Sequence, residues 1–61
     1  MKILVRQHVN NGDKSNKTFT NIDDALKQLG KGLNEVYLKV DWLNQVDLYF
    51  TGTKDYLRIT N

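Results

Sequence analysis

The residues of this 61-residue chain that could bind a partner are its tyrosines, arginines and lysines. Several of them recur at every second position in strand-like stretches. If the strand-like stretches alternate between two faces, one face collects Leu4, Arg6, His8, Tyr37, Lys39, Asp41, Asp47, Tyr49, Tyr56 and Arg58. Tyrosines beside cations can stack on nucleic-acid bases, and they are also enriched at protein–protein hot spots. An ordinary half-exposed sheet face has the same composition. We therefore treat seven of these residues as a candidate binding face: Arg6, His8, Tyr37, Lys39, Tyr49, Tyr56 and Arg58.

A second candidate site is the segment 10–17, NNGDKSNK, which is dense in turn-forming residues. Asn11-Gly12 is a strong hairpin signal, because both residues tolerate positive φ. Lys14 and Lys17 could make this segment a basic arm that follows a phosphate backbone. A solvated hairpin tip is the simpler explanation of the same two lysines.

The sequence offers no clear catalytic group. His8 has no evident nucleophile or orienting partner, so a surface role is expected. Asp41 and Asp47 flank a predicted turn at 43–45, but an open sheet face provides no cleft to shift their pKa values. Residues 51–54, TGTK, lack the first glycine of a phosphate-binding loop and precede no helix. We expect a protein that is not an enzyme.

Composition argues against several further classes. With one histidine and no cysteine, the chain has no disulfide and no usual zinc ligand set, so we expect neither a metal nor a cofactor. No apolar run approaches the ~20 residues that span a bilayer, and no secretory leader is visible, so we expect no membrane partner and a cytoplasmic location. Seven Asn, seven Lys and no Pro suggest a microbial or phage-like origin.

The net charge of +2 is uneven along the chain. Residues 1–20 carry four basic residues and one acidic residue, an excess of three positive charges, whereas residues 35–61 carry three basic and four acidic residues. So mild an excess does not by itself indicate a nucleic-acid partner.

The elements that must position these side chains follow from the hydrophobic pattern. Strands are predicted at 2–9, 17–20, 35–42, 46–51 and 56–60. A helix is predicted at 22–30, capped by Asn21 and ended by Gly30, with an apolar stripe at Ile22, Ala25, Leu26 and Leu29. The order is ββαβββ, and residues 1–61 are expected to form one α+β domain.

One helix can cover only one face of a four- or five-stranded antiparallel sheet. The expected inner residues are Ile3, Val5, Val9, Phe19, Ile22, Leu26, Leu29, Val36, Leu38, Val40, Val46, Leu48, Phe50, Leu57 and Ile59. Trp42 falls on the same face of its strand. Two strand orders, 2-1-3-4-5 and 3-4-5-1-2, make all neighbours antiparallel, and the pattern does not choose between them.

Two functions are compatible with this fold. The first is a small binding or accessory protein that uses the exposed sheet face or an edge strand to contact another protein or a second copy of itself. The alternative is a nucleic-acid-binding regulator that uses the face tyrosines and the basic N-terminal hairpin. Strong salt dependence of binding would distinguish the second from the first.

Overall fold

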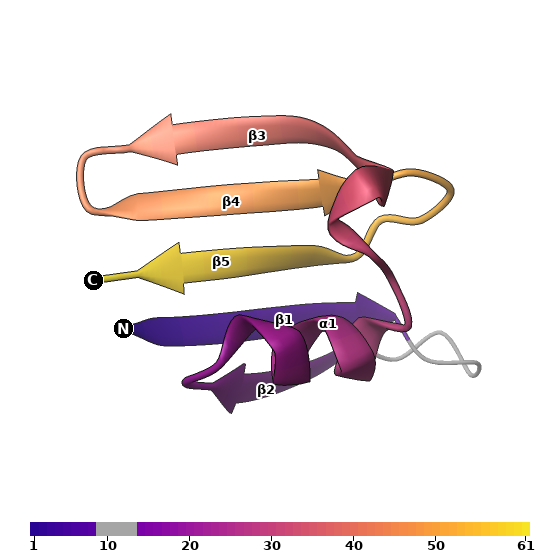
Figure 1. Ribbon diagram of the computed structural model, residues 1–61, viewed down its shortest axis with the longest axis horizontal. Helices are drawn as coiled ribbons and strands as arrows, with labels where there is room; N and C mark the ends of the chain where they lie inside the picture. The colour runs from indigo at the N-terminus through magenta and orange to yellow at the C-terminus, as the bar shows by residue number, and fades with distance from the viewer. Residues whose placement is uncertain (9–13) are drawn as a thin grey trace.

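The computed structural model describes residues 1–8 and 14–61 and has the predicted α+β architecture, with one α-helix on one face of an antiparallel sheet (Figure 1). Its elements follow the predicted ββαβββ order, with a short 3-10 turn, η1, after the helix. They are β1 (Lys2–His8), β2 (Lys14–Phe19), α1 (Ile22–Leu29), η1 (Leu33–Glu35), β3 (Val36–Trp42), β4 (Gln45–Phe50) and β5 (Tyr56–Thr60).

The five strands lie in the order β2-β1-β5-β4-β3, which is one of the two predicted arrangements read from the other edge. Every neighbouring pair is antiparallel. The first and last strands pair at the middle of the sheet, where Lys2 lies opposite Thr60, so both chain ends are at the same end of the sheet (Figure 1). The N-terminal hairpin and the C-terminal three-stranded meander are thus joined by the β1–β5 ladder.

The helix begins and ends where the sequence predicts. The Asn21 side chain accepts hydrogen bonds from the backbone N–H groups of Asp23 (2.8 Å) and Asp24 (3.4 Å), which would otherwise lack partners in the first turn. Gly30 closes the last turn with φ of 69°, a left-handed conformation that costs glycine little. Figure 1 shows α1 lying over β1 and β2, whereas in the described part of the chain the β3–β4 side has only the short η1 beside it, at one end.

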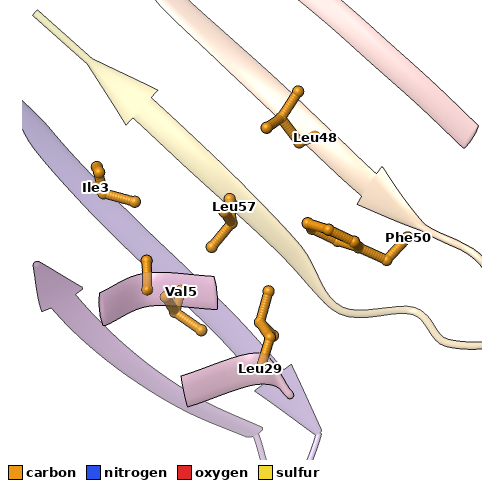
Figure 2. Close-up of a cluster of buried hydrophobic side chains, with 7 residues drawn as sticks. Ile3, Val5, Leu29, Leu48, Phe50 and Leu57 are labelled. Atoms are coloured by element: carbon orange, nitrogen blue, oxygen red, sulfur yellow. The ribbon is translucent and has the colours of Figure 1, made fainter. Parts of the chain in front are cut away.

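The core lies between the helix and the middle of the sheet. Ile3 and Val5 from β1, Leu57 from β5 and Phe50 from β4 are almost completely buried, and Ala25 and Leu29 meet them from the helix (Figure 2). Around this cluster lie partly buried apolar side chains: Phe19, Ile22, Leu26, Val36, Val46 and Ile59. These residues were all predicted to face inward, apart from Ala25, which belongs to the predicted helix stripe. The prediction for Val9 lies outside the described residues.

The faces predicted for β3 are wrong over most of its length. The turn after β3 holds only Leu43 and Asn44, so Trp42 pairs with Gln45 rather than with Val46. A one-residue change of register moves every side chain to the opposite face. Leu38 and Val40 therefore lie opposite Tyr49 and Asp47, on the side of the sheet away from the helix.

Near its start, β3 returns to the predicted face, although not to the predicted register. The ladder shifts by one residue between Val36 and Leu38, and Val36 pairs with Phe50 on the helix side. This irregularity has the geometry of a β-bulge, in which an extra residue (here Tyr37) interrupts the alternation. Beyond this bulge the register set by the two-residue turn holds, so Lys39 and Asp41, predicted on the helix-free face, lie on the helix side opposite Leu48 and Val46.

Two leucine truncations test this assignment of faces. Leu57→Ala removes a side chain that is fully buried and should cost about 2–5 kcal/mol of unfolding free energy. Leu38→Ala removes one that is 45% exposed and should cost less than about 1 kcal/mol. Urea unfolding at low protein concentration measures both. A loss for Leu38→Ala as large as that for Leu57→Ala would place Leu38 in the core and contradict the register.

Candidate functional site

The helix-free face of the sheet is ordered in three rows of side chains that run across the strands. One row contains Leu38, Tyr49, Tyr56, Arg6 and Asn16, in the order β3, β4, β5, β1, β2. The next contains Val40, Asp47, Arg58, Leu4 and Thr18, and the third Trp42, Gln45, Thr60 and Lys2. The aromatic and apolar groups are therefore concentrated toward β3.

A buried carboxylate lies at the centre of this otherwise open face. Asp47 is 1% exposed, and Arg58 from β5 donates to both of its oxygens, through Nε at 3.0 Å and Nη2 at 3.2 Å. The indole N–H of Trp42 and the side-chain amide of Gln45 each donate to it at 3.3 Å. A buried carboxylate is tolerated when its oxygens are hydrogen-bonded and a cation balances its charge. The four donors satisfy both conditions.

Two tyrosines and the same arginine form the neighbouring part of the face. Tyr49 and Tyr56 are cross-strand partners whose ring centroids lie 5.5 Å apart at a tilt of 44°. The Arg58 guanidinium lies 5.4 Å from the centroid of Tyr56, within the range of a cation–π contact. Hydrogen bonding to Asp47 raises the pKa of Arg58 above its ordinary value. Arg58 is thus a permanent cation whose charge is already paired.

Leu38, Val40 and Trp42 are the residues of this face that sequence reasoning missed. Leu38 and Trp42 are 45% and 59% exposed, and Val40 lies between them on the same strand. They form an apolar column along β3 that adjoins Tyr49 through the Leu38–Tyr49 pair. The signal that could have found them is the length of the β3–β4 turn, since two residues instead of three reverse the faces of β3.

The structure brings together only some of the predicted binding residues. Tyr49, Tyr56 and Arg58 lie side by side, and Arg6 continues the tyrosine row while donating to Asn16 at 3.0 Å. Tyr37, at the bulge, is 61% exposed. Lys39 lies on the opposite face and is therefore not part of this group.

The prediction that Lys14 and Lys17 lie in a basic loop is wrong, because both residues belong to strand β2, which begins at Lys14. Lys17 pairs with Val5 of β1 and thus belongs to the helix side of the sheet, where it is exposed. Lys14 is the first residue of β2 and pairs with His8. Residues 9–13, which include the predicted Asn11-Gly12 turn, lie outside the described residues.

His8 has a carboxylate partner that the sequence did not reveal. Asp55, just before β5, accepts the backbone N–H of His8 at 2.9 Å and lies 3.0 Å from its Nδ1 through the same oxygen. The backbone N–H of Asp55 donates to the Thr53 hydroxyl at 3.2 Å. The pair therefore joins the end of β1 to the β4–β5 loop, which indicates a structural role for His8.

Metal-binding clusters, pockets and membrane-spanning helices are absent from the described part of the chain. Within residues 1–8 and 14–61, no three or more His, Cys, Asp or Glu side chains are grouped so as to hold a metal ion. No pocket is found in this described part of the chain. Among the same residues, no helix has the length and apolarity needed to cross a membrane.

Comparisons with protein-family models, curated proteins and solved structures find no match to this chain.

The Asp55–His8 contact predicts a specific dependence of stability on pH. Burial raises the pKa of the Asp55 carboxyl, but hydrogen bonds from the backbone and ring of His8, and from Thr53, lower it more, so its pKa lies below the ordinary value of 3.8. A lowered folded-state pKa gives stabilisation that is complete above the unfolded value and is lost as pH falls through the folded value. The contribution of Asp55 is thus full above the unfolded pKa of about 3.9 and is lost progressively as pH falls through the lower folded-state pKa.

We therefore compare the wild type with Asp55→Asn by urea unfolding between pH 7 and pH 2.5. At pH 7 the wild type should be more stable by about 1.5–3 kcal/mol, the usual worth of hydrogen bonds to a charged group. This advantage should shrink as pH falls below 3.8. An advantage that stays constant to pH 2.5 would show that the charge of Asp55 does not stabilise the fold.

Proposed function

We propose that this chain is a small non-enzymatic binding protein that recognises another protein through the helix-free face of its sheet. The observation that carries the proposal is the reversed register of β3, which adds Leu38, Val40 and Trp42 to the face that already holds Tyr49 and Tyr56. Exposed apolar side chains that adjoin aromatic ones are typical of protein-interaction sites.

The electrostatics of this face favour a polypeptide over a nucleic acid. A phosphate backbone is bound by cations that can release its counterions. The charge of Arg58 is paired with buried Asp47, and Lys39 lies on the other face, 4.0 Å from Asp41. Of the three predicted cations of the face, only Arg6 keeps its charge there without an acidic partner among the described residues.

The buried pair also prepares the face for binding. Because Asp47 fixes the Arg58 guanidinium and the Trp42 indole by hydrogen bonds, both groups lose less conformational freedom when a partner arrives. A rigid aromatic surface with a paired charge at its centre suits a partner with apolar side chains and a few hydrogen-bonding groups.

To test the proposal, peptides are selected from a displayed random library on the immobilised protein, and the best is titrated into ¹⁵N-labelled protein. We expect shifts at the Trp42 indole N–H, the Arg58 Nε–H and the amides of β3 and β4. Leu38→Ser should weaken binding about tenfold, as expected for loss of an interface anchor. The matched control Lys17→Ser, at an exposed position on the opposite face, should bind as the wild type does.

Two results would contradict the proposal. In the first, peptides bind Leu38→Ser as tightly as the wild type and shift residues of the helix side. In the second, short DNA binds tightly at about 0.15 M salt and is released by Arg6→Gln, which would make a nucleic acid the partner of this face.

A further inference from the structure

The β3 strand is an outer edge of the sheet, so one side of its backbone has no neighbouring strand among residues 1–8 and 14–61. Such an edge is a template for pairing with another strand unless charge, proline or cover blocks it. Six large hydrophobic residues are exposed in the described part of the chain, and four belong to β3 or the turn after it: Tyr37, Leu38, Trp42 and Leu43. This edge therefore has both unpaired backbone and apolar side chains.

We propose that β3 of a second copy of this chain pairs with β3 in antiparallel orientation. The twofold axis that relates the two copies passes between their Val40 residues, and we call this the axis through Val40. The two sheets would then join into one continuous sheet. This inference goes beyond the proposed recognition of another protein and does not depend on it, because the backbone edge and the charges of β3 carry it.

The charges of β3 select this register. When Val40 lies opposite Val40 of the second copy, Lys39 lies opposite Asp41 of that copy, and the twofold axis generates the same pair again. Both side chains are well exposed, at 60% and 66%, on one face of the strand. Opposite charges directly across an antiparallel pair are favourable, and like charges are unfavourable. Two cross-strand ion pairs therefore form in this register.

The neighbouring symmetric registers lack this complementarity. An axis through Lys39 would place the two Lys39 side chains opposite each other, and an axis through Asp41 would do the same with two carboxylates. Each costs a like-charge contact at the centre of the interface. The axis through Val40 is thus the favoured one of the three.

The helix-free face of the strand agrees with the same register. There Leu38 lies opposite Trp42 of the second copy, and Trp42 opposite its Leu38, on either side of the two Val40 side chains. Pairing would thus place the exposed apolar column of β3 beside the column of the second copy on one continuous face. Reciprocal contacts of this kind, in which Leu38 meets Trp42 and Trp42 meets Leu38, are characteristic of a closed twofold dimer.

The other edge of the sheet does not offer an equal alternative. The β2 sequence, KSNKTF, contains two lysines and no acidic residue, so two β2 strands would bring only positive charge together. Lysines on an edge strand are a common means of preventing such pairing. The β3 edge, with one charge of each sign, lacks this protection.

Introduced thiols test the position of the axis. The chain contains no cysteine, so Val40→Cys supplies the only thiol of each copy. Cross-strand partners have Cα atoms about 4.5–5.5 Å apart, which a disulfide can bridge. Under mild oxidation the variant should form a covalent dimer of twice 7.1 kDa.

The matched control is Leu38→Cys on the same face of the same strand. In the proposed register its two thiols are offset by four residues, about 13 Å along the strand, which is too far for a disulfide. Equal crosslinking of both variants, or crosslinking of Leu38→Cys alone, would overturn the proposed axis.

Charge reversal tests the ion pairs without burying or exposing any side chain. Lys39→Asp and Asp41→Lys each turn two attractive pairs into two repulsive ones, so each should raise the dissociation constant of the dimer about tenfold in sedimentation equilibrium. An equimolar mixture of the two variants should recover the wild-type constant, because opposite charges then face each other in the heterodimer. The double variant should recover it too.

The proposal is overturned if the wild type sediments as a monomer at about 1 mM, or if the single variants dimerise as well as the wild type. These outcomes leave peptide recognition by Tyr49, Tyr56 and Leu38 unaffected, since that titration is run at low protein concentration. Conversely, failure to select any peptide would not change the sedimentation or the crosslinking. The two proposals are thus tested separately.

Discussion

The register of β3 on β4 is the constraint on which the helix-free face depends. A turn of two residues pairs Trp42 with Gln45, which directs Leu38, Val40 and Trp42 away from the helix. The irregularity between Val36 and Leu38 then returns Val36 to the core beside Phe50. The strand thereby contributes to both sides of the sheet, with its first residue packed against the core and most of its apolar side chains on the open face.

This division separates the part of the molecule that holds the fold from the part that presents a surface. The helix covers β1 and β2, and the core lies between it and the middle strands (Figure 1). The β3 edge is away from that cover and leaves apolar groups exposed. Between the two regions, Asp47 neutralises Arg58 and orients Trp42, so the aromatic surface contains no unpaired buried side-chain polar group among the described residues.

Much of the fold could be predicted from local signals, whereas the site could be predicted only in part. Asn21 and Gly30 marked the ends of the helix, and alternation in the other strands identified Ile3, Val5, Leu57 and Phe50 as core. The residues of β3 were assigned to the wrong faces because Gln45 was counted in the turn rather than as the first residue of β4. Strict alternation gives two equally regular solutions for such a strand, and only turn length and cross-strand partners distinguish them.

The contact between His8 and Asp55 could not be predicted from the sequence for a different reason. His8 and Asp55 are 47 residues apart, and their contact depends on β1 lying beside β5, which was one of two predicted strand orders. Asp47 and Arg58 were both placed on the correct face, yet their pairing needed the β4–β5 register as well. Long-range partners of this kind follow from topology and not from local pattern.

The most direct test of the account is a nuclear Overhauser measurement of the cross-strand contacts of β3. The register described here predicts contacts between the backbone protons of Leu38 and Tyr49 and between those of Val40 and Asp47, with Val36 near Phe50. Contacts of Leu38 with Phe50 and of Val40 with Leu48 would instead show the three-residue turn and unbroken alternation. That result would return the apolar column to the helix side and remove the surface on which the proposed recognition of another protein rests.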